Sequence, residues 1–467
     1  MLQTNKAYRR FSLTSREPPA ISRADGLRTR EFARLDRTGH VYLDYTGAAL
    51  PAESQVRRHL ALLTEQVLGN PHSENPASRH STDLIERARH RVLAFFNASP
   101  DDYCVIFTAN ASQALKLVGE SYPFAPDTPF LLTFDNHNSV NGIREFARAR
   151  GAPVRYLPVI PPDLRADATA VERALADLPA SARGLFAYPA QSNFSGVQHR
   201  LEWIECAQTN GWHVLLDAAA FVPTNQLDLS RWHPDFVTLS FYKIFGHPTG
   251  VGALIARRTA LARLRRPWFA GGTITVASVG ADRHVLARNE SAFEDGTPNF
   301  GNLAAVEIGL DFVEEIGIGT IHTRAYRLTE WLLDRLRSLR HATGRPLATL
   351  LGPKNMVDRG PTVTFNIYDA QGRFIDHQAV EKRAAERGIS LRTGCFCNPG
   401  AGEVALGISA EEMATCFARS DDPMSYDDFR RCIDGKSSGA VRVSLGLANN
   451  LADVRAFLEF AQSFLAR

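Results

Sequence analysis

Short apolar runs alternate with amphipathic stretches through the first two thirds of the chain. Seven of these runs are rich in aliphatic and β-branched residues and too short for long helices, which is typical of buried strands. They span residues 104–108, 130–134, 154–157, 184–188, 213–217, 235–240 and 252–256. Apolar residues at helical spacing lie between them, at 81–96, 112–121, 141–150, 168–178 and 201–209. Because strands that alternate with helices form parallel sheets, the pattern predicts an α/β fold whose mainly parallel seven-stranded sheet carries helices on both faces.

The pattern changes after residue 301. Long helical stretches at 303–316 and 321–342 precede a short strand at 362–366 and a helix at 376–387. This change predicts a smaller α+β C-terminal domain over residues 303–467, following a large domain over 41–302 whose residues 41–65 could pack on the small one. Residues 1–40 are interpreted as a basic, partly disordered lead-in, with an organellar presequence as the alternative. Residues 420–438, rich in Asp, Ser and Gly, are expected to form a loop or insertion.

Composition and charge narrow the range of partners. The 467 residues are 44% hydrophobic, and 53 basic and 50 acidic residues are mixed along the chain. No basic stripe suits nucleic acid, and no apolar stretch reaches the roughly 20 residues that span a bilayer. Six cysteines are too few for a disulfide scaffold in a chain of this length. We therefore expect free thiols, a cytoplasmic location, no nucleic-acid or membrane partner, and small molecules or proteins as partners.

Lys243 is the most conspicuous candidate for chemistry. The chain has only six lysines against 47 arginines, and this one follows the strand predicted at 235–240. Ligands of α/β proteins bind at the ends of such strands, and a partly desolvated amine there becomes a nucleophile toward carbonyls. Lys243 is therefore a candidate for a Schiff base, and the alternative is a surface lysine on a connecting loop.

A Schiff-base lysine suggests pyridoxal 5'-phosphate, which needs a carboxylate for its ring nitrogen and amides for its phosphate. Asp217 ends an apolar run, where a charge is costly unless it is paired; the alternative is a cap of the next helix. Ala111 and Ser112 open a helix directly after a strand, and small residues there let backbone amides approach an anion. A plain N-cap is the alternative for Ser112.

Two further polar residues follow predicted strands. His137 could lie on the cofactor ring and exchange protons, although a lone histidine is more often structural. Asn193, in Gln-Ser-Asn-Phe-Ser-Gly, could bind the phenolic oxygen of the cofactor, and an Asx-turn is the alternative.

Two thiols lie in the turn-prone segment Arg-Thr-Gly-Cys-Phe-Cys-Asn-Pro-Gly at 392–400. Positive charge from Arg392 and exposed amides favour the thiolate. No second Cys pair at ligand spacing accompanies Cys395 and Cys397, so no metal site is predicted. A disulfide between them would be strained, which favours a nucleophile or persulfide carrier. Arg442, in an alternating segment, could clamp a substrate carboxylate; the alternative is a charge on an edge strand.

Taken together, these stretches resemble the class V, fold type I aminotransferases, and among them the cysteine desulfurases and the N-terminal desulfurase-like domain of the molybdenum cofactor sulfurases. The segments that carry the resemblance occur in family order, at 42–50, 69–73, 135–140, 188–196, 240–246, 392–400 and 439–444.

The resemblance implies a role for each matching residue. Lys243 would attach the cofactor covalently, Asp217 would pair with its ring nitrogen, His137 would stack on the ring and Asn193 would contact the phenolic oxygen. The phosphate would be held by Ala111, Ser112, Ser240 and Tyr242, and by Thr297 from the other subunit of a homodimer. Arg442, together with Arg392, would bind the substrate.

The resemblance also implies a reaction. L-cysteine would give alanine and a persulfide on Cys397, for delivery to an acceptor that the sequence does not identify; Cys395 is the rival nucleophile. A C–S lyase or an aminotransferase-like enzyme on the same fold is the alternative, and a non-catalytic scaffold is a third.

Several positions depart from the pattern. Ala220 replaces a glutamine that many cysteine desulfurases have, whereas Tyr242 favours the sulfurase type. A third cysteine is absent near the pair, and the chain ends at Arg467 without room for the C-terminal domain of full-length sulfurases. Molybdenum cofactor is therefore not implied as the acceptor.

Overall fold

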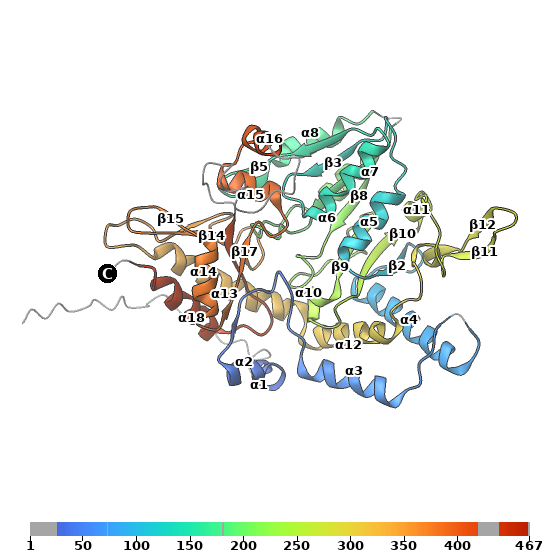
Figure 1. Ribbon diagram of the computed structural model, residues 1–467, viewed down its shortest axis with the longest axis horizontal. Coiled ribbons are helices and arrows are strands. Elements are labelled where there is room, and N and C mark those ends of the chain that lie inside the picture. The colour runs from blue at the N-terminus through green and yellow to red at the C-terminus, as the bar shows by residue number, and fades with distance from the viewer. Residues whose placement is uncertain (1–25, 72, 180–181, 419–438, 466–467) are drawn as a thin grey trace, which may run out of the picture.

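A seven-stranded sheet organises the larger part of the molecule (Figure 1). The computed structural model describes residues 26–71, 73–179, 182–418 and 439–465. Strand β10 runs antiparallel to both of its neighbours, and every other pair in this sheet is parallel. In spatial order the strands are β2 (Tyr103–Thr108), β10 (Gly252–Arg257), β9 (Phe236–Ser240), β8 (Trp212–Asp217), β7 (Gly184–Pro189), β3 (Phe130–Thr133) and β4 (Val154–Leu157). All seven predicted strands are confirmed, each within one residue at either end.

Helices cover both faces of this sheet, as predicted. Successive side chains of a strand point to opposite faces, so Leu185 and Phe186 of β7 join different apolar cores. One core includes side chains from α4 (Pro76–Phe95), α8 (Ala168–Ala176), α9 (Trp203–Thr209) and α12 (Phe300–Ile316). The other includes side chains from α5 (Ala111–Ser121), α7 (Ile143–Ala149) and α11 (Arg258–Leu261).

Helix α12 begins the stretch that was assigned to the small domain, but it packs with the large one. Leu303, Val306 and Leu310 lie in the same core as α4. We therefore propose that the boundary falls near Gly317, between α12 and α13 (Ile318–Ser338), instead of at residue 302.

Two predicted helices differ from the observed ones because of local capping. Helix α4 begins five residues before the expected residue 81, since the Asn75 side chain accepts a hydrogen bond from the Ser78 amide (3.0 Å) and Pro76 takes the first helical position. The helix expected at 141–150 is two helices, α6 (Asn138–Asn141) and α7, separated at Gly142.

The smaller unit is built on an antiparallel sheet with strand order β13-β14-β18-β17, with β15 paired to β14. Its strands are β13 (Ala348–Leu350), β14 (Thr362–Tyr368), β15 (Phe374–Ile375), β17 (Arg392–Gly394) and β18 (Ala440–Ser444). Helices α13, α14 (His377–Ala385) and α18 (Leu451–Gln462) share its apolar core. Because β18 lies between β14 and β17, Arg442 is on an inner strand, and the edge-strand alternative for it is wrong.

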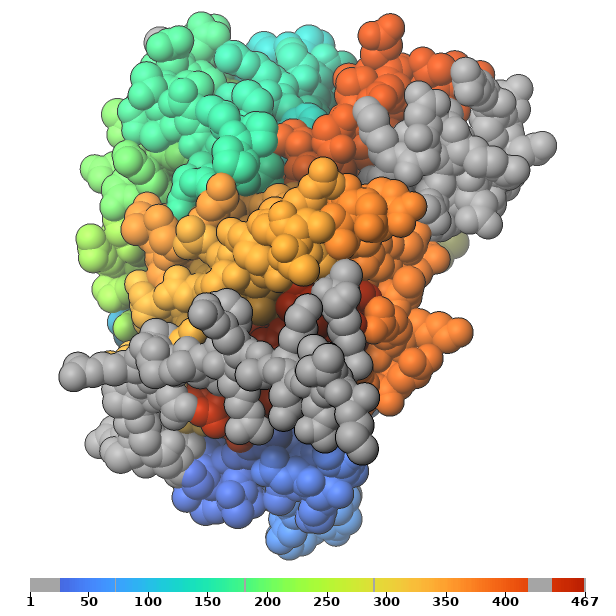
Figure 2. Space-filling model, turned by 90° about the vertical axis from the view of Figure 1, so that its left-hand side faces the viewer, coloured from blue at the N-terminus to red at the C-terminus, as the bar shows by residue number. Residues whose placement is uncertain are grey.

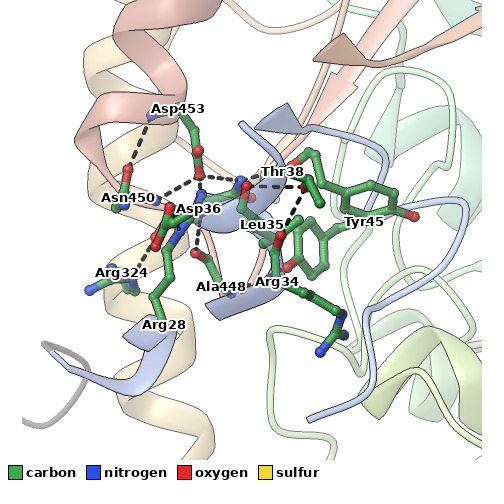
Figure 3. A network of polar contacts seen from close by, with 12 residues as sticks. Arg28, Arg34, Leu35, Asp36, Thr38, Tyr45, Arg324, Ala448, Asn450 and Asp453 are labelled. Atoms are coloured by element: carbon green, nitrogen blue, oxygen red, sulfur yellow. Dashed lines mark hydrogen bonds and ion pairs between the residues drawn. The ribbon is translucent and has the colours of Figure 1, made fainter. Parts of the chain in front are cut away.

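The N-terminal segment packs on this smaller unit. Helices α1 (Leu27–Glu31) and α2 (Ala33–Thr38) precede β1 (Val41–Tyr42), which pairs in parallel with β16 (Ile389–Ser390). Arg28 donates to Asp453 of α18 (2.7 Å), to the carbonyl of Ala448 (3.0 Å) and to Asp36 (2.8 Å) (Figure 3). The expected lead-in therefore ends before Leu27; its first 25 residues lie outside the described part of the chain.

Other elements surround the two sheets. Figure 2 shows the small unit, yellow to red, between the N-terminal segment in blue below and the region of α8 in teal above. The elements not yet placed are α3 (Glu53–Glu65), β5 (Val159–Ile160), β6 (Arg165–Ala166), α10 (Phe241–Phe245), β11 (Ile274–Ser278), β12 (Arg283–Leu286), a 3-10 helix (Asn289–Phe293), α15 (Pro399–Leu406) and α16 (Ala410–Ala418).

Three further expectations concern the covalent and loop structure. Cys416 is disulfide-bonded, so the expectation of free thiols throughout is wrong there, whereas Cys104, Cys206, Cys395 and Cys397 are free. The loop expected at 420–438 lies outside the described residues. Within the described ranges, no helix is both long and apolar enough to cross a membrane.

Candidate active site

Lys243 lies just beyond the carboxyl end of β9, in the one-and-a-half-turn helix α10. Its side chain is half-buried. Burial lowers the pKa of its amine, the Asp217 carboxylate opposes this effect, and the Arg442 guanidinium adds to it. A lowered pKa leaves more of the amine unprotonated near neutral pH, which is the form that attacks a carbonyl.

A cavity of about 290 Å³ opens around this amine. Eight of the residues predicted for the cofactor line it: Ala111, Ser112, His137, Asn193, Asp217, Ser240, Tyr242 and Lys243. They come from segments that follow β2, β3, β7, β8 and β9, and ligands bind at these carboxyl ends in α/β sheets. Sequence-distant candidates are thus collected at one edge of the sheet.

One end of the cavity is formed by the start of α5. The amide of Ala111 donates to Ser240 Oγ at 2.9 Å, and the hydroxyls of Ser112 and Ser139 lie 2.6 Å apart. The Gln113 amide is capped by Asn110 Oδ1 at 3.0 Å, whereas the Ser112 amide has no partner within the helix and lies in the positive partial charge of the helix start. This end suits a phosphate.

Asp217 and His137 also line the cavity. The Asp217 side chain is buried and accepts a hydrogen bond from the Ala219 amide at 3.0 Å. His137 Nδ1 accepts from the Ser139 amide at 3.1 Å, so the proton of the neutral ring resides on Nε2. Burial lowers the pKa of His137, and Asp217 opposes this effect. The imidazole is therefore mainly neutral at neutral pH and able to give or take a proton.

A short segment that we call the Cys loop (residues 394–398) is hydrogen-bonded to Asn193, which lines the cavity. Phe396 and Cys397 both have left-handed backbones, with φ of 56° and 54°. The Phe396 carbonyl accepts from Asn193 Nδ2 at 2.7 Å, and the Cys397 carbonyl accepts from the Asn138 amide at 2.7 Å. Asn398 Nδ2 donates to Asn193 Oδ1 at 2.9 Å. Because left-handed conformations are unfavourable for residues other than glycine, these bonds hold the loop in a shape it would not adopt alone.

The two thiols of the Cys loop face different surroundings, although both are exposed. Burial has the largest effect on the pKa of the Lys243 amine and lowers it. Asp217 opposes this effect, and the Cys397 sulfur is close enough to oppose it as well. Cys395 instead lies toward α15, since a Cβ added to Gly402 would be 3.9 Å from Cys395 Cβ. Of the two thiols, Cys397 is the one that affects the lysine electrostatically.

The two arginines expected to bind substrate meet at one carboxylate. Arg442, which is buried, donates to Asp44 at 2.9 Å, and the half-exposed Arg392 donates twice to the same carboxylate, at 3.0 and 2.6 Å. Sequence reasoning assigned no role to Asp44. Its signal was present, because an acid directly follows the apolar Val41-Tyr42-Leu43 run, but its partners lie more than 340 positions away.

The Aminotransferase class-V family model matches residues 41–457. The chain belongs to the class V aminotransferase family.

Curated relatives of this class V chain are molybdenum cofactor sulfurases. The chain is 38% identical to the molybdenum cofactor sulfurase of Arabidopsis thaliana, and the match covers 94% of this chain and 58% of the relative. It is 40% identical to the molybdenum cofactor sulfurase of Homo sapiens, and that match covers 96% of this chain and 53% of the relative. The chain therefore spans little more than half the length of the curated relatives it matches.

Solved structures similar to the class V chain share its fold. The cysteine desulfurase of Thermococcus onnurineus has a TM-score of 0.77 at 22% identity and covers 96% of this chain and 99% of its own. The cysteine desulfurase CsdA of Escherichia coli has a TM-score of 0.75 at 19% identity, over 95% and 99%. A cystine C–S lyase has a TM-score of 0.69 at 18% identity, over 93% and 100%.

Among the residues predicted to bind the cofactor, Thr297 alone does not line the cavity around Lys243. It lines a separate cavity of about 200 Å³ with Lys116 and Glu120 of α5. Its predicted contact with the phosphate of a second subunit stays a prediction. Ser139 and Gln191 line the Lys243 cavity and were not singled out in the sequence, because a serine two residues after a histidine and a glutamine in a loop carry no local signal.

Proposed function

We propose that this protein is a pyridoxal 5'-phosphate-dependent cysteine desulfurase that takes sulfur from L-cysteine as a persulfide on Cys397 and releases alanine. The observation that carries this proposal is the Cys loop with its free Cys397 thiol, which a hydrogen bond from Asn193 to Phe396 holds beside the cavity of the half-buried Lys243. The curated relatives, named as sulfurases, support a sulfur-transferring reaction.

The residues around the cavity fit this cofactor. Asp217 supplies a buried carboxylate for the ring nitrogen, the start of α5 with Ser240 supplies donors for the phosphate, and Lys243 supplies the amine for covalent attachment. When bound, the cofactor draws electrons from the substrate's α-carbon. Tyr242 and Asn193 would contact its remaining edges.

The protein's own groups would then divide the work. Arg442 and Arg392 hold the substrate carboxylate, and Lys243 takes the proton from the α-carbon. The Cys397 thiolate attacks the substrate sulfur, an S–S bond forms, and the C–S bond breaks with its electron pair left on carbon. The β-carbon takes up a proton, for which His137 Nε2 is the candidate donor, Lys243 returns a proton to the α-carbon, and alanine leaves. The persulfide then awaits an acceptor, a protein or small molecule.

A C–S lyase is the second candidate function. It is favoured by the fold shared with a cystine C–S lyase and by Ala220, which lines the cavity where a larger polar side chain would give the cofactor another partner. A lyase would need Lys243 but not Cys397.

The assembly and location are part of the same proposal. We infer a homodimer in which Thr297 lies near the partner's phosphate; in support, Thr297 lines a neighbouring cavity and not the one around the Lys243 of its own subunit. We propose a cytoplasmic location, because four described cysteines are free and the cytoplasm is reducing. The disulfide at Cys416 is not expected in a reducing compartment.

The test compares Cys397→Ser with Cys395→Ser. Each purified protein, loaded with pyridoxal 5'-phosphate, is incubated with L-cysteine, and alanine, pyruvate and protein-bound sulfur are quantified. A desulfurase gives alanine and bound sulfur in equal amounts, loses both with Cys397→Ser and retains them with Cys395→Ser. Pyruvate and free sulfide that persist in Cys397→Ser would establish the lyase instead.

A further inference from the structure

Asp44 joins the two arginines expected at the substrate carboxylate. Its Oδ1 accepts from Arg442 Nη2, and its Oδ2 accepts from Arg392 Nε and Nη2. The side chains of Asp44 and Arg442 are 8% and 4% exposed, whereas that of Arg392 is 53% exposed. We call these three residues the Asp44 cluster. It holds two positive charges and one negative charge, with the negative charge between them.

The position of this carboxylate is fixed by the backbone around it. Asp44 forms a parallel bridge with Ser444, two residues after Arg442 on β18, and the Ser444 amide donates to the Leu43 carbonyl at 2.8 Å. A Cβ on Gly47 would lie only 2.5 Å from Asp44 Oδ2, so a glycine there leaves the space that the carboxylate occupies. The carboxylate is thus held in place whether or not a substrate is bound.

The cluster also contacts Asn193, which lines the cavity around Lys243. Arg442 donates to the Asn193 carbonyl at 3.0 Å and lies 4.7 Å above the ring of Phe396. Its Nε is buried without a hydrogen-bond partner among the described residues. Burial is the main cause of the lowered pKa of the Lys243 amine. Arg442 lowers this pKa further, and Asp44 raises it. The charge balance of the cluster is therefore felt at the reacting amine.

We propose that Asp44 is a specificity-determining residue that restricts the site to amino acids with a single carboxylate. The cluster carries one net positive charge, which one substrate carboxylate neutralises. A second negative charge would be left uncompensated beside buried groups, which is unfavourable. This inference rests on the proposed desulfurase function and extends it, because it states why cysteine is accepted and an acidic amino acid is not.

The test measures binding instead of turnover. L-alanine and L-aspartate are titrated into the cofactor-loaded protein, and the two dissociation constants are read from cofactor absorbance. Since a charge within about 4–6 Å changes ionic preference by roughly 10- to 1,000-fold, Asp44→Asn should shift the ratio toward aspartate by about tenfold or more. The matched control is Asp311→Asn, which removes the partner of Arg91 (2.7 Å) on α4, away from the cavity; its ratio should equal that of the wild type.

A second variant covers the case in which Asp44→Asn does not fold. Arg392→Gln removes a half-exposed positive charge and should shift the ratio in the opposite direction, away from aspartate. The alternative is that Asp44 only ties the N-terminal segment to the small unit. In that case neither folded variant changes the ratio of the two dissociation constants by more than about threefold, and this outcome refutes the proposal. Alanine production from L-cysteine by the wild type is measured separately, so a failure of the desulfurase proposal is seen there and not in the binding ratio.

Discussion

Removing the Asn193 side chain should loosen the Cys loop without unfolding the protein. The amide of Asn193 donates to the Phe396 carbonyl and accepts from Asn398. At about 0.5–1.5 kcal/mol for each hydrogen bond, the two contribute roughly 1–3 kcal/mol to the closed loop. Against them stand the left-handed backbones of Phe396 and Cys397, which cost about 1–2 kcal/mol each. Because these terms are of similar size, Asn193→Ala should open the loop about 5- to 150-fold more often.

Hydrogen exchange followed by mass spectrometry measures this opening directly. The Asn398 amide donates to the Cys395 carbonyl at 3.0 Å and the Asn138 amide to the Cys397 carbonyl, so peptides covering these amides should exchange faster in Asn193→Ala by the same factor. The matched control is Asn225→Ala, since the Asn225 amide also bonds a backbone carbonyl (3.0 Å) and a second side chain, but far along the chain from the loop. Exchange within about twofold of the wild type in Asn193→Ala would refute the idea that this side chain holds the loop.

Three other perturbations give separate checks. Lys243→Ala should leave no cofactor mass on the protein after borohydride reduction, whereas the wild type gains it. Burial lowers the pKa of His137, so the unfolded state binds its proton at a higher pH than the folded state does. His137 should therefore reduce the free energy of unfolding as the pH falls from about 6.5 toward the lowered pKa. His137→Gln should make this loss of stability smaller in urea titrations at pH 7 and 5.5, and an unchanged loss would contradict the prediction. Arg28→Ala leaves a buried carboxylate unpaired and should cost about 3–5 kcal/mol, whereas Arg57→Ala breaks only an exposed pair with Glu53 and should cost less than about 1 kcal/mol; equal losses in urea unfolding would contradict the difference in burial.

The central sheet could be predicted because its strands carry their own signal. A strand of a parallel sheet is buried on both faces and is therefore apolar throughout, as at Gly184–Pro189 and Phe236–Ser240. The same signal does not distinguish directions, so nothing local marks β10 as the antiparallel strand. The start of α4 was missed for a different reason, since it depends on which side chain caps the first turn.

The candidate site was predicted in its composition but not in all its contacts. Residues that follow strands, such as Asp217 and Lys243, are brought together by the sheet itself, and a strand-by-strand pattern is enough to find them. The pairing of Asp44 with Arg442 joins positions 398 apart, and no periodicity or spacing reports such a contact. Asn193 was placed correctly at the cavity, but the direction of its amide toward the Cys loop is set by tertiary packing.

The parallel pairing of Val41–Tyr42 with Ile389–Ser390 has a consequence for synthesis on the ribosome. At about 5–20 residues per second, the partner strand follows roughly 20–70 s after the first one. During that interval the large sheet, whose seven strands end at Arg257, has already emerged. The early segment is therefore synthesised long before its partner strand, and the Cys loop can form only after residue 398 has emerged. A nascent chain would thus hold the lysine before it holds the thiol.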